Sequence, residues 1–144
     1  MHETAIAAEA KRVADILAEV PSSFCGTLDY HIKRRGYTNE KMEERTGISS
    51  RMIQDYRKKK DSNITLQSVL ALCIGLNLQP AFSYDLILKA GFNIMTAQDE
   101  HLIYRYLIEH HHMENIFMWN EKLQDAGIPQ QLPKNGNKMT APEK

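Results

Sequence analysis

Three consecutive histidines, His110, His111 and His112, stand beside Glu109 and downstream of His101. Imidazole is a common ligand of transition metals, so this group raises the question of a metal site. Successive helical residues point about 100° apart, which prevents three adjacent histidines from converging on one ion. The spacing His-Glu-x-x-His, which places two ligands on one helical face, is absent. We therefore expect a solvated helix end here and no metal site.

The sequence also lacks the motifs of catalysis and cofactor binding. It contains no glycine-rich phosphate loop, no Gly-x-Ser-x-Gly and no Cys-His pair at motif spacing. The two cysteines, Cys25 and Cys73, are far apart and show no CxxC spacing, so we expect neither a disulfide framework nor a zinc knuckle. These absences predict a protein that is not an enzyme and needs no cofactor.

Positive charge is concentrated in one short stretch of a chain whose formal net charge is zero. Residues 31–60 carry ten lysines and arginines against four acidic residues, a net charge of +6, and the rest of the chain carries −6. Such a stretch favours a polyanionic partner. On charge alone, a solvated helical face without a partner explains it equally well.

The size and composition fit an ordinary globular protein. The chain has 144 residues, 42% hydrophobic and 25% charged, which suits one domain with helical extensions. The longest apolar run, Val69 to Leu76, is too short to cross a bilayer, and the N-terminus lacks the apolar centre of a signal peptide. We therefore expect a cytoplasmic protein that does not associate with membranes.

Capping residues and glycines divide the chain into helices, and the alternating pattern of strands is absent. The expected helices cover about 4–20, 24–35, 38–46, 49–58, 65–76, 80–91, 98–111 and 115–126. The fold class is therefore all-α. The expected divisions are an N-terminal helix (1–22), a central domain (23–92), a C-terminal helical hairpin (93–132) and a polar, disordered tail (133–144).

Helical spacing also predicts which side chains face inward. Met52, Ile53 and Tyr56 are expected on the inner side of the fourth helix. In the hairpin, the inner residues are expected to be Leu102, Ile103, Tyr106, Leu107, Ile116, Trp119 and Leu123.

Residues 38–58 satisfy the spacing of a helix-turn-helix. That motif needs apolar contacts in both helices and a turn residue that tolerates positive φ. Met42 supplies the inner contact of the first helix, Gly47 the turn, and Ile48 an apolar plug after it. Ile53 and Tyr56 supply the inner face of the second helix. Five spaced requirements are met.

The stretch from Tyr37 to Arg57, with Thr46-Gly47-Ile48-Ser49 at its centre, resembles the Cro/C1-type (XRE-like) helix-turn-helix family of repressors. The resemblance covers about 28–91, and the run from Leu66 to Leu78 is similar to the family's following core helix. It implies a lambda-repressor-like bundle that binds double-stranded DNA specifically and regulates transcription. Its recognition helix, about 49–58, would enter the major groove.

The resemblance also implies roles for particular residues. The base-contacting positions are Ser50, Arg51 and Asp55, and Arg51 is the strongest candidate because a guanidinium binds guanine bidentately. Gln54 lies one position off the family's pattern and is a further candidate, for contact with adenine or with phosphate. The backbone-contacting positions are Thr38, Asn39, Arg57, Lys58 and Lys59, which set affinity more than sequence choice. An exposed arginine paired with Asp55 is the alternative explanation of Arg51.

One position departs from the family. The residue after Met42 is usually small, often alanine, and here it is Glu43, whose carboxylate we expect to point to solvent or to meet a nearby base. This departure keeps a second function open, a protein-interaction module such as an antitoxin, an adaptor or the regulatory part of a regulator-peptidase system. A homodimer is expected because such folds read two half-sites, with dimer contacts from the hairpin around Trp119.

Overall fold

The structure, a computed structural model, describes residues 4–58 and 63–133. Within these ranges the chain forms eight helices and no strand, which confirms the all-α expectation. The helices are α1 (Ala5–Glu19), α2 (Phe24–Arg35), α3 (Asn39–Thr46), α4 (Ser50–Lys58), α5 (Leu66–Gly75), α6 (Pro80–Lys89), α7 (Asp99–His110) and α8 (Ile116–Asp125). The tail was expected to be disordered from residue 133 onward, and all of its residues after Pro133 lie outside the described ranges.

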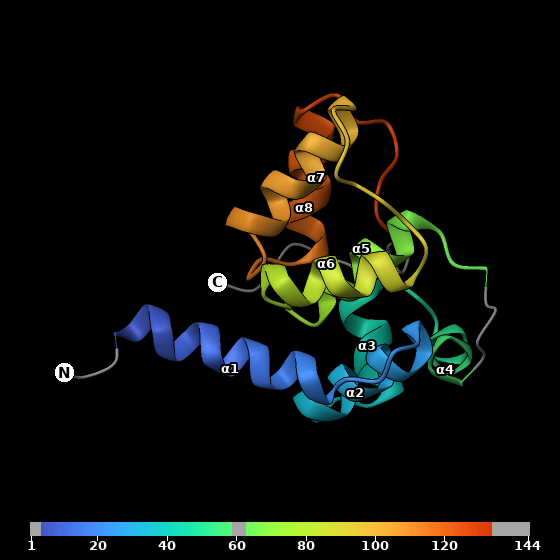
Figure 1. Cartoon of the computed structure of the whole chain (residues 1–144). Helices are drawn as coiled ribbons and strands as arrows, with labels where there is room; N and C mark the ends of the chain where they lie inside the picture. The colour runs from blue at the N-terminus through green and yellow to red at the C-terminus, as the bar shows by residue number, and fades with distance from the viewer. Residues whose placement is uncertain (1–3, 59–62, 134–144) are drawn as a thin grey trace.

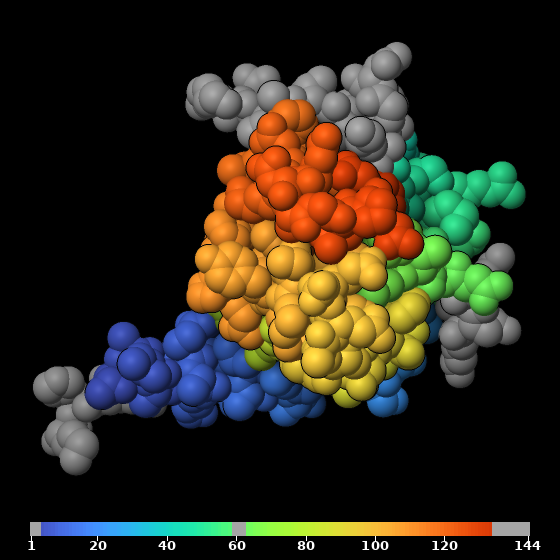
Figure 2. Space-filling view, turned by 90° about the horizontal axis from the view of Figure 1, so that it is seen from above, coloured from blue at the N-terminus to red at the C-terminus, as the bar shows by residue number. Residues whose placement is uncertain are grey.

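The helices lie in three tiers. Figure 1 shows α7 and α8 at the top, α5 and α6 in the middle, and α1 to α4 below. The middle tier contacts both others, since α5 packs against α3 and α8 while α6 packs against α2 and α7. From above, the hairpin covers the body and α1 extends beyond it (Figure 2). The domain with α4 at its edge is thus supported from one side by the hairpin.

The helices begin and end where the sequence predicts. The hydroxyls of Thr38 and Thr65 accept hydrogen bonds from the backbone N–H groups of Lys41 and Ser68, at 3.0 and 3.1 Å. Both bonds satisfy amide groups that have no partner inside the helix. At the other end of α3, Gly47 has φ of 77°, a left-handed conformation that other residues adopt only with strain.

The core is centred on α5. All of its residues from Val69 to Gly75 are buried, as a helix that is apolar on every side requires. A single hydrophobic cluster joins them to Leu28 of α2 and Ile53 of α4, and also to Trp119 of α8. The hairpin and the central helices therefore share one core.

Three side chains expected in this core lie at the surface instead. Met52, Leu102 and Tyr106 are exposed by 40%, 45% and 57%. In α7 the buried residues are Tyr104, Leu107 and Ile108. Apolar residues occupy 102, 103, 106 and 107 as well as 103, 104, 107 and 108, so two faces have equal helical spacing. Packing against α6, not periodicity, decides between them.

The expected dimer contact at Trp119 is wrong. The indole is only 1% exposed, and its N–H donates to the carbonyl oxygen of His111 at 2.9 Å. A side chain that closes the hairpin core in this way does not present a surface to a second chain.

Candidate nucleic-acid interface

The two helices α3 and α4 meet across a short turn and share a buried apolar contact. Met42 and Ile53 have no exposed surface, and Ile48 and Tyr56 are nearly as deeply buried. Gly47 provides the left-handed turn between them. These are the five positions that the spacing predicted, and the structure confirms their arrangement as a helix-turn-helix.

The buried Thr46 fixes the turn from inside. Its hydroxyl donates to the Met42 carbonyl at 2.7 Å and accepts from the Ile48 N–H at 3.0 Å. Its methyl group lies against Gly75 of α5, so closely that a Cβ atom at position 75 would be 2.5 Å from Thr46 Cγ2. Helices α3 and α5 therefore approach each other closely at this glycine.

The Glu43 carboxylate, expected to point to solvent or to meet a nearby base, is half-buried and reaches the start of α4. Its Oε1 accepts a hydrogen bond from the backbone N–H of Ser50, the first residue of α4, at 2.8 Å. The Ser49 hydroxyl accepts from the Met52 N–H at 3.2 Å. Two of the amide groups at the start of α4 thus have side-chain partners, and one of these comes from the preceding helix.

The predicted base-contacting residues lie on the outer side of α4. With about 100° between successive residues, positions 50, 51, 54, 55 and 58 fall within a sector of about 140° opposite Ile53 and Tyr56. Arg51, Gln54 and Lys58 are exposed, and Ser50 and Asp55 are half-buried. Within the described residues, Arg51 forms no ion pair. The helix therefore turns one polar face outward, with an arginine at its beginning and a lysine at its end.

Arg57 differs from the other predicted contact residues because its guanidinium is already bound. Its Nε and Nη2 lie 2.8 and 2.7 Å from Asp29 Oδ1, and Nη1 donates to Asn39 Oδ1 at 2.7 Å. The side chain is 15% exposed. Lys33 binds the other oxygen of Asp29 at 3.0 Å, and these cations hold the pKa of Asp29 below its ordinary value although burial opposes them. Arg57 therefore joins α4 to α2 and to the start of α3.

Several other cations of the basic stretch also have local partners. Arg35 donates to the Leu76 carbonyl at 3.0 Å, and Arg34 lies over the Phe82 ring at 5.2 Å. Arg45 donates to the Gly75 carbonyl and to the Asn77 side chain. The charge count alone thus overstates how many of these side chains are available to a partner. Lys59, a further predicted contact, lies outside the described residues.

The Arg45 bonds continue into the hairpin. Asn77, which has a positive φ of 48°, donates from its side chain to the carbonyls of His112 and Glu114, both at 3.0 Å. Residues of α3, the α5–α6 connection and the hairpin turn are linked in one hydrogen-bonded group. This group fixes the end of α3 on the supporting tiers.

No other part of the described chain offers a comparable site. Its titratable side chains contain no group of three that could hold a metal ion. His111 instead lies 2.6 Å from Glu114, and His101 bonds Thr96. Both cysteines are buried and free, and burial raises the pKa of Cys73 to about 12. A thiol protonated so firmly is a poor nucleophile.

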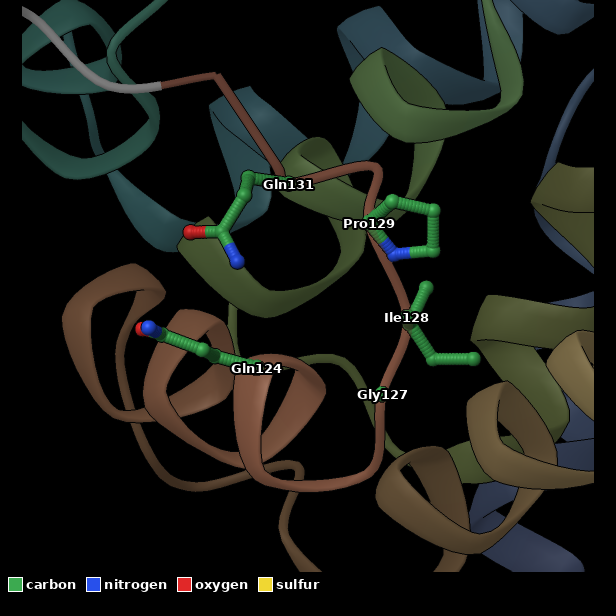
Figure 3. A pocket seen from close by; sticks show the side chains of 5 residues that line it. All are labelled: Gln124, Gly127, Ile128, Pro129 and Gln131. Carbon is green, nitrogen blue, oxygen red and sulfur yellow. The ribbon is translucent and has the colours of Figure 1, made fainter.

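A cavity at the end of the hairpin has no charged side chain among its described lining residues. It has a volume of about 510 Å³ and is bordered by Gln124, Gly127, Ile128, Pro129 and Gln131 (Figure 3). The described lining offers amide groups but no acid, base or nucleophile. Elsewhere, none of the described helices is long and apolar enough to cross a membrane.

Comparison with known proteins supports the geometry of α2 to α6. Residues 27–81 match the family model of the Cro/C1-type HTH DNA-binding domain. The match begins within α2, contains the whole of α3, α4 and α5, and ends at the start of α6. Comparisons with curated proteins and with solved structures found no match.

Proposed function

We propose that this chain, which contains a Cro/C1-type helix-turn-helix DNA-binding domain at residues 27–81, is a sequence-specific regulator of transcription. In this proposal α4 lies in the major groove of duplex DNA. The family's role is binding, and we assign no reaction to the chain.

The outer face of α4 is the observation that carries the proposal. Ile53 and Tyr56 fix the helix to the core, and the opposite side presents Arg51, Gln54 and Lys58 to solvent. A helix so placed can enter a groove without loss of core contacts. Arg51 is the proposed reader of guanine, with Ser50, Gln54 and Asp55 beside it.

Backbone contacts come from the start of α3 and the end of α4. Thr38 and Asn39, with the first amide groups of α3, and Lys58 and Lys59 are the proposed phosphate contacts. Arg57 takes a different role, that of a positioning residue. Arg57 donates to the side-chain oxygen of Asn39, so the side-chain NH₂ group of Asn39 remains as the donor to a phosphate.

The experiment is selection of bound duplexes from a random pool, followed by a salt series on the selected duplex. We expect one enriched sequence and an affinity that falls about a thousandfold between roughly 50 and 200 mM salt, as six phosphate contacts require. Absence of binding to any duplex at low salt would contradict the proposal. That result would instead favour a protein-interaction module. The main reason to consider such a module was that Glu43 could disrupt the helix-turn-helix, and this reason is weakened because the Glu43 carboxylate caps α4.

A homodimer is also proposed, since such domains bind paired half-sites about one helical turn apart. The selected sequence tests it directly. An inverted repeat is expected, and a single half-site bound by a monomer would contradict dimeric binding.

A further inference from the structure

Glu43 is the residue at which this chain departs from the family that it resembles. It lies on the side of α3 that faces α4, where the family usually has a small residue. The carboxylate crosses the turn and accepts the N–H of Ser50 at 2.8 Å. A side chain of α3 thus bonds the first residue of α4.

The bond acts at the part of α4 that we assign to base recognition. Ser50 and Arg51 are the first two residues of α4, and the first amides of any helix have no partner within it. The Ser49 hydroxyl accepts the N–H of Met52, and the Glu43 carboxylate accepts the N–H of Ser50. A carboxylate at this end also interacts favourably with the helix dipole. The first turn of α4 is therefore held from both sides.

We propose that Glu43 is a positioning residue for sequence discrimination. It fixes the direction in which Ser50 and Arg51 leave α4, and it acts on DNA only through them. The inference rests on the proposed function. It has a specific consequence. Discrimination between bases depends on Glu43 at the base pair that Arg51 reads. At the base pair that Gln54 reads, one turn further along α4, it does not.

The test compares Glu43→Ala with Glu43→Gln and with Glu44→Ala. Glutamine keeps an acceptor for the Ser50 N–H but removes the charge. Glu44 is an exposed neighbour on α3 that pairs with Lys41 at 3.0 Å, so Glu44→Ala controls for the loss of one negative charge near DNA. Each variant of the full chain is titrated with the selected duplex and with its single base-pair variants. Arg51→Ala and Gln54→Ala identify the base pairs that those two side chains read.

The measured quantity is the ratio of affinities for the selected and the altered duplex. Partial unfolding lowers both affinities by the same factor, so the ratio reports recognition and not the folded fraction. We expect Glu43→Ala to lose about fivefold in this ratio at the base pair of Arg51, the factor that corresponds to one helix cap. We expect no loss at the base pair of Gln54, near-complete retention in Glu43→Gln, and unchanged ratios in Glu44→Ala.

Equal ratios in Glu43→Ala and Glu44→Ala would overturn the inference. So would an equal loss at every base pair, or a loss in Glu43→Gln as large as in Glu43→Ala. If the unaltered chain discriminates among duplexes while Glu43→Ala behaves like it, only this inference fails. If the unaltered chain binds no duplex, both the proposed function and this inference fail. The capping bond can still be measured in that case, because Glu43→Ala should then unfold at a lower temperature than Glu44→Ala.

Discussion

His31 should make the stability of this fold depend on pH above the range in which carboxylates titrate. The side chain is fully buried on α2, with its ring 5.3 Å from that of Phe82 and 5.5 Å from that of Tyr30. Its Nε2 has no hydrogen-bond partner within the described residues. Burial, with the nearby charge of Arg34 adding to it, lowers the pKa of His31 from 6.5 to about 4.

The direction of the effect follows from proton binding. The unfolded chain takes up a proton near pH 6.5, while the folded chain resists it until about pH 4. Stability is therefore complete above the unfolded value and is lost as the pH falls between the two. At pH 5 the free energy of unfolding should be about 2 kcal/mol lower than at pH 7.5, from about 1.4 kcal/mol per pH unit below 6.5.

Urea unfolding at pH 7.5 and at pH 5 measures this difference. His31→Leu removes the titrating group and keeps an apolar side chain against Phe82, so the difference should largely disappear. His110→Gln is the matched control, because His110 is exposed at the end of α7 and its replacement should leave the difference intact. The same pH dependence in His31→Leu as in the unaltered chain would refute the assignment to His31.

Three further changes test the packing and the contacts around α4. Ile53→Ala should lower the free energy of unfolding by about 2–5 kcal/mol by opening a cavity. Met52→Ala, at an exposed position, should change it by less than about 0.5 kcal/mol. Similar urea midpoints for the two variants would mean that the inner face of α4 is misassigned. Gly75→Ala should cost about 1–3 kcal/mol, because Thr46 is held by two hydrogen bonds and cannot move from the new methyl group; a stabilised variant in thermal unfolding would contradict this. Arg57→Lys should weaken binding to all duplexes alike by about fivefold, because lysine cannot hold Asp29 and Asn39 together; a change at one base pair only, measured by fluorescence anisotropy, would assign Arg57 to base contact.

Local signals were sufficient to locate the helices and the helix-turn-helix. Thr38, Thr65 and Gly47 mark boundaries by side-chain and backbone chemistry that acts within a few residues. The four buried positions Met42, Ile48, Ile53 and Tyr56 likewise follow from local spacing around Gly47. For these features, sequence and structure agree because the interactions that decide them are short in range.

The interactions that join different helices could not be predicted from the sequence in the same way. The bond from Glu43 to Ser50 depends on how α3 and α4 cross, and the Arg57–Asp29 pair joins residues 28 positions apart. The inner face of α7 was ambiguous for a related reason, because two faces have the same apolar spacing and the contact with α6 selects one. The sequence pattern predicts that Trp119 is an inner residue, but the hydrogen bond of its N–H to the carbonyl of His111, which leaves it unsuited to a dimer contact, joins two parts of the hairpin.

The measurement that bears most directly on the central claim is the affinity of Arg51→Ala and Lys58→Ala for the selected duplex and all of its single base-pair variants. Arg51→Ala should lose discrimination at one base pair, by about 1–3 kcal/mol, and keep it elsewhere. Lys58→Ala should weaken binding to every duplex equally and reduce the salt slope by about 1. If the two variants change all affinities in the same uniform way, α4 does not read bases through Arg51, and the account of this helix as the recognition element is wrong.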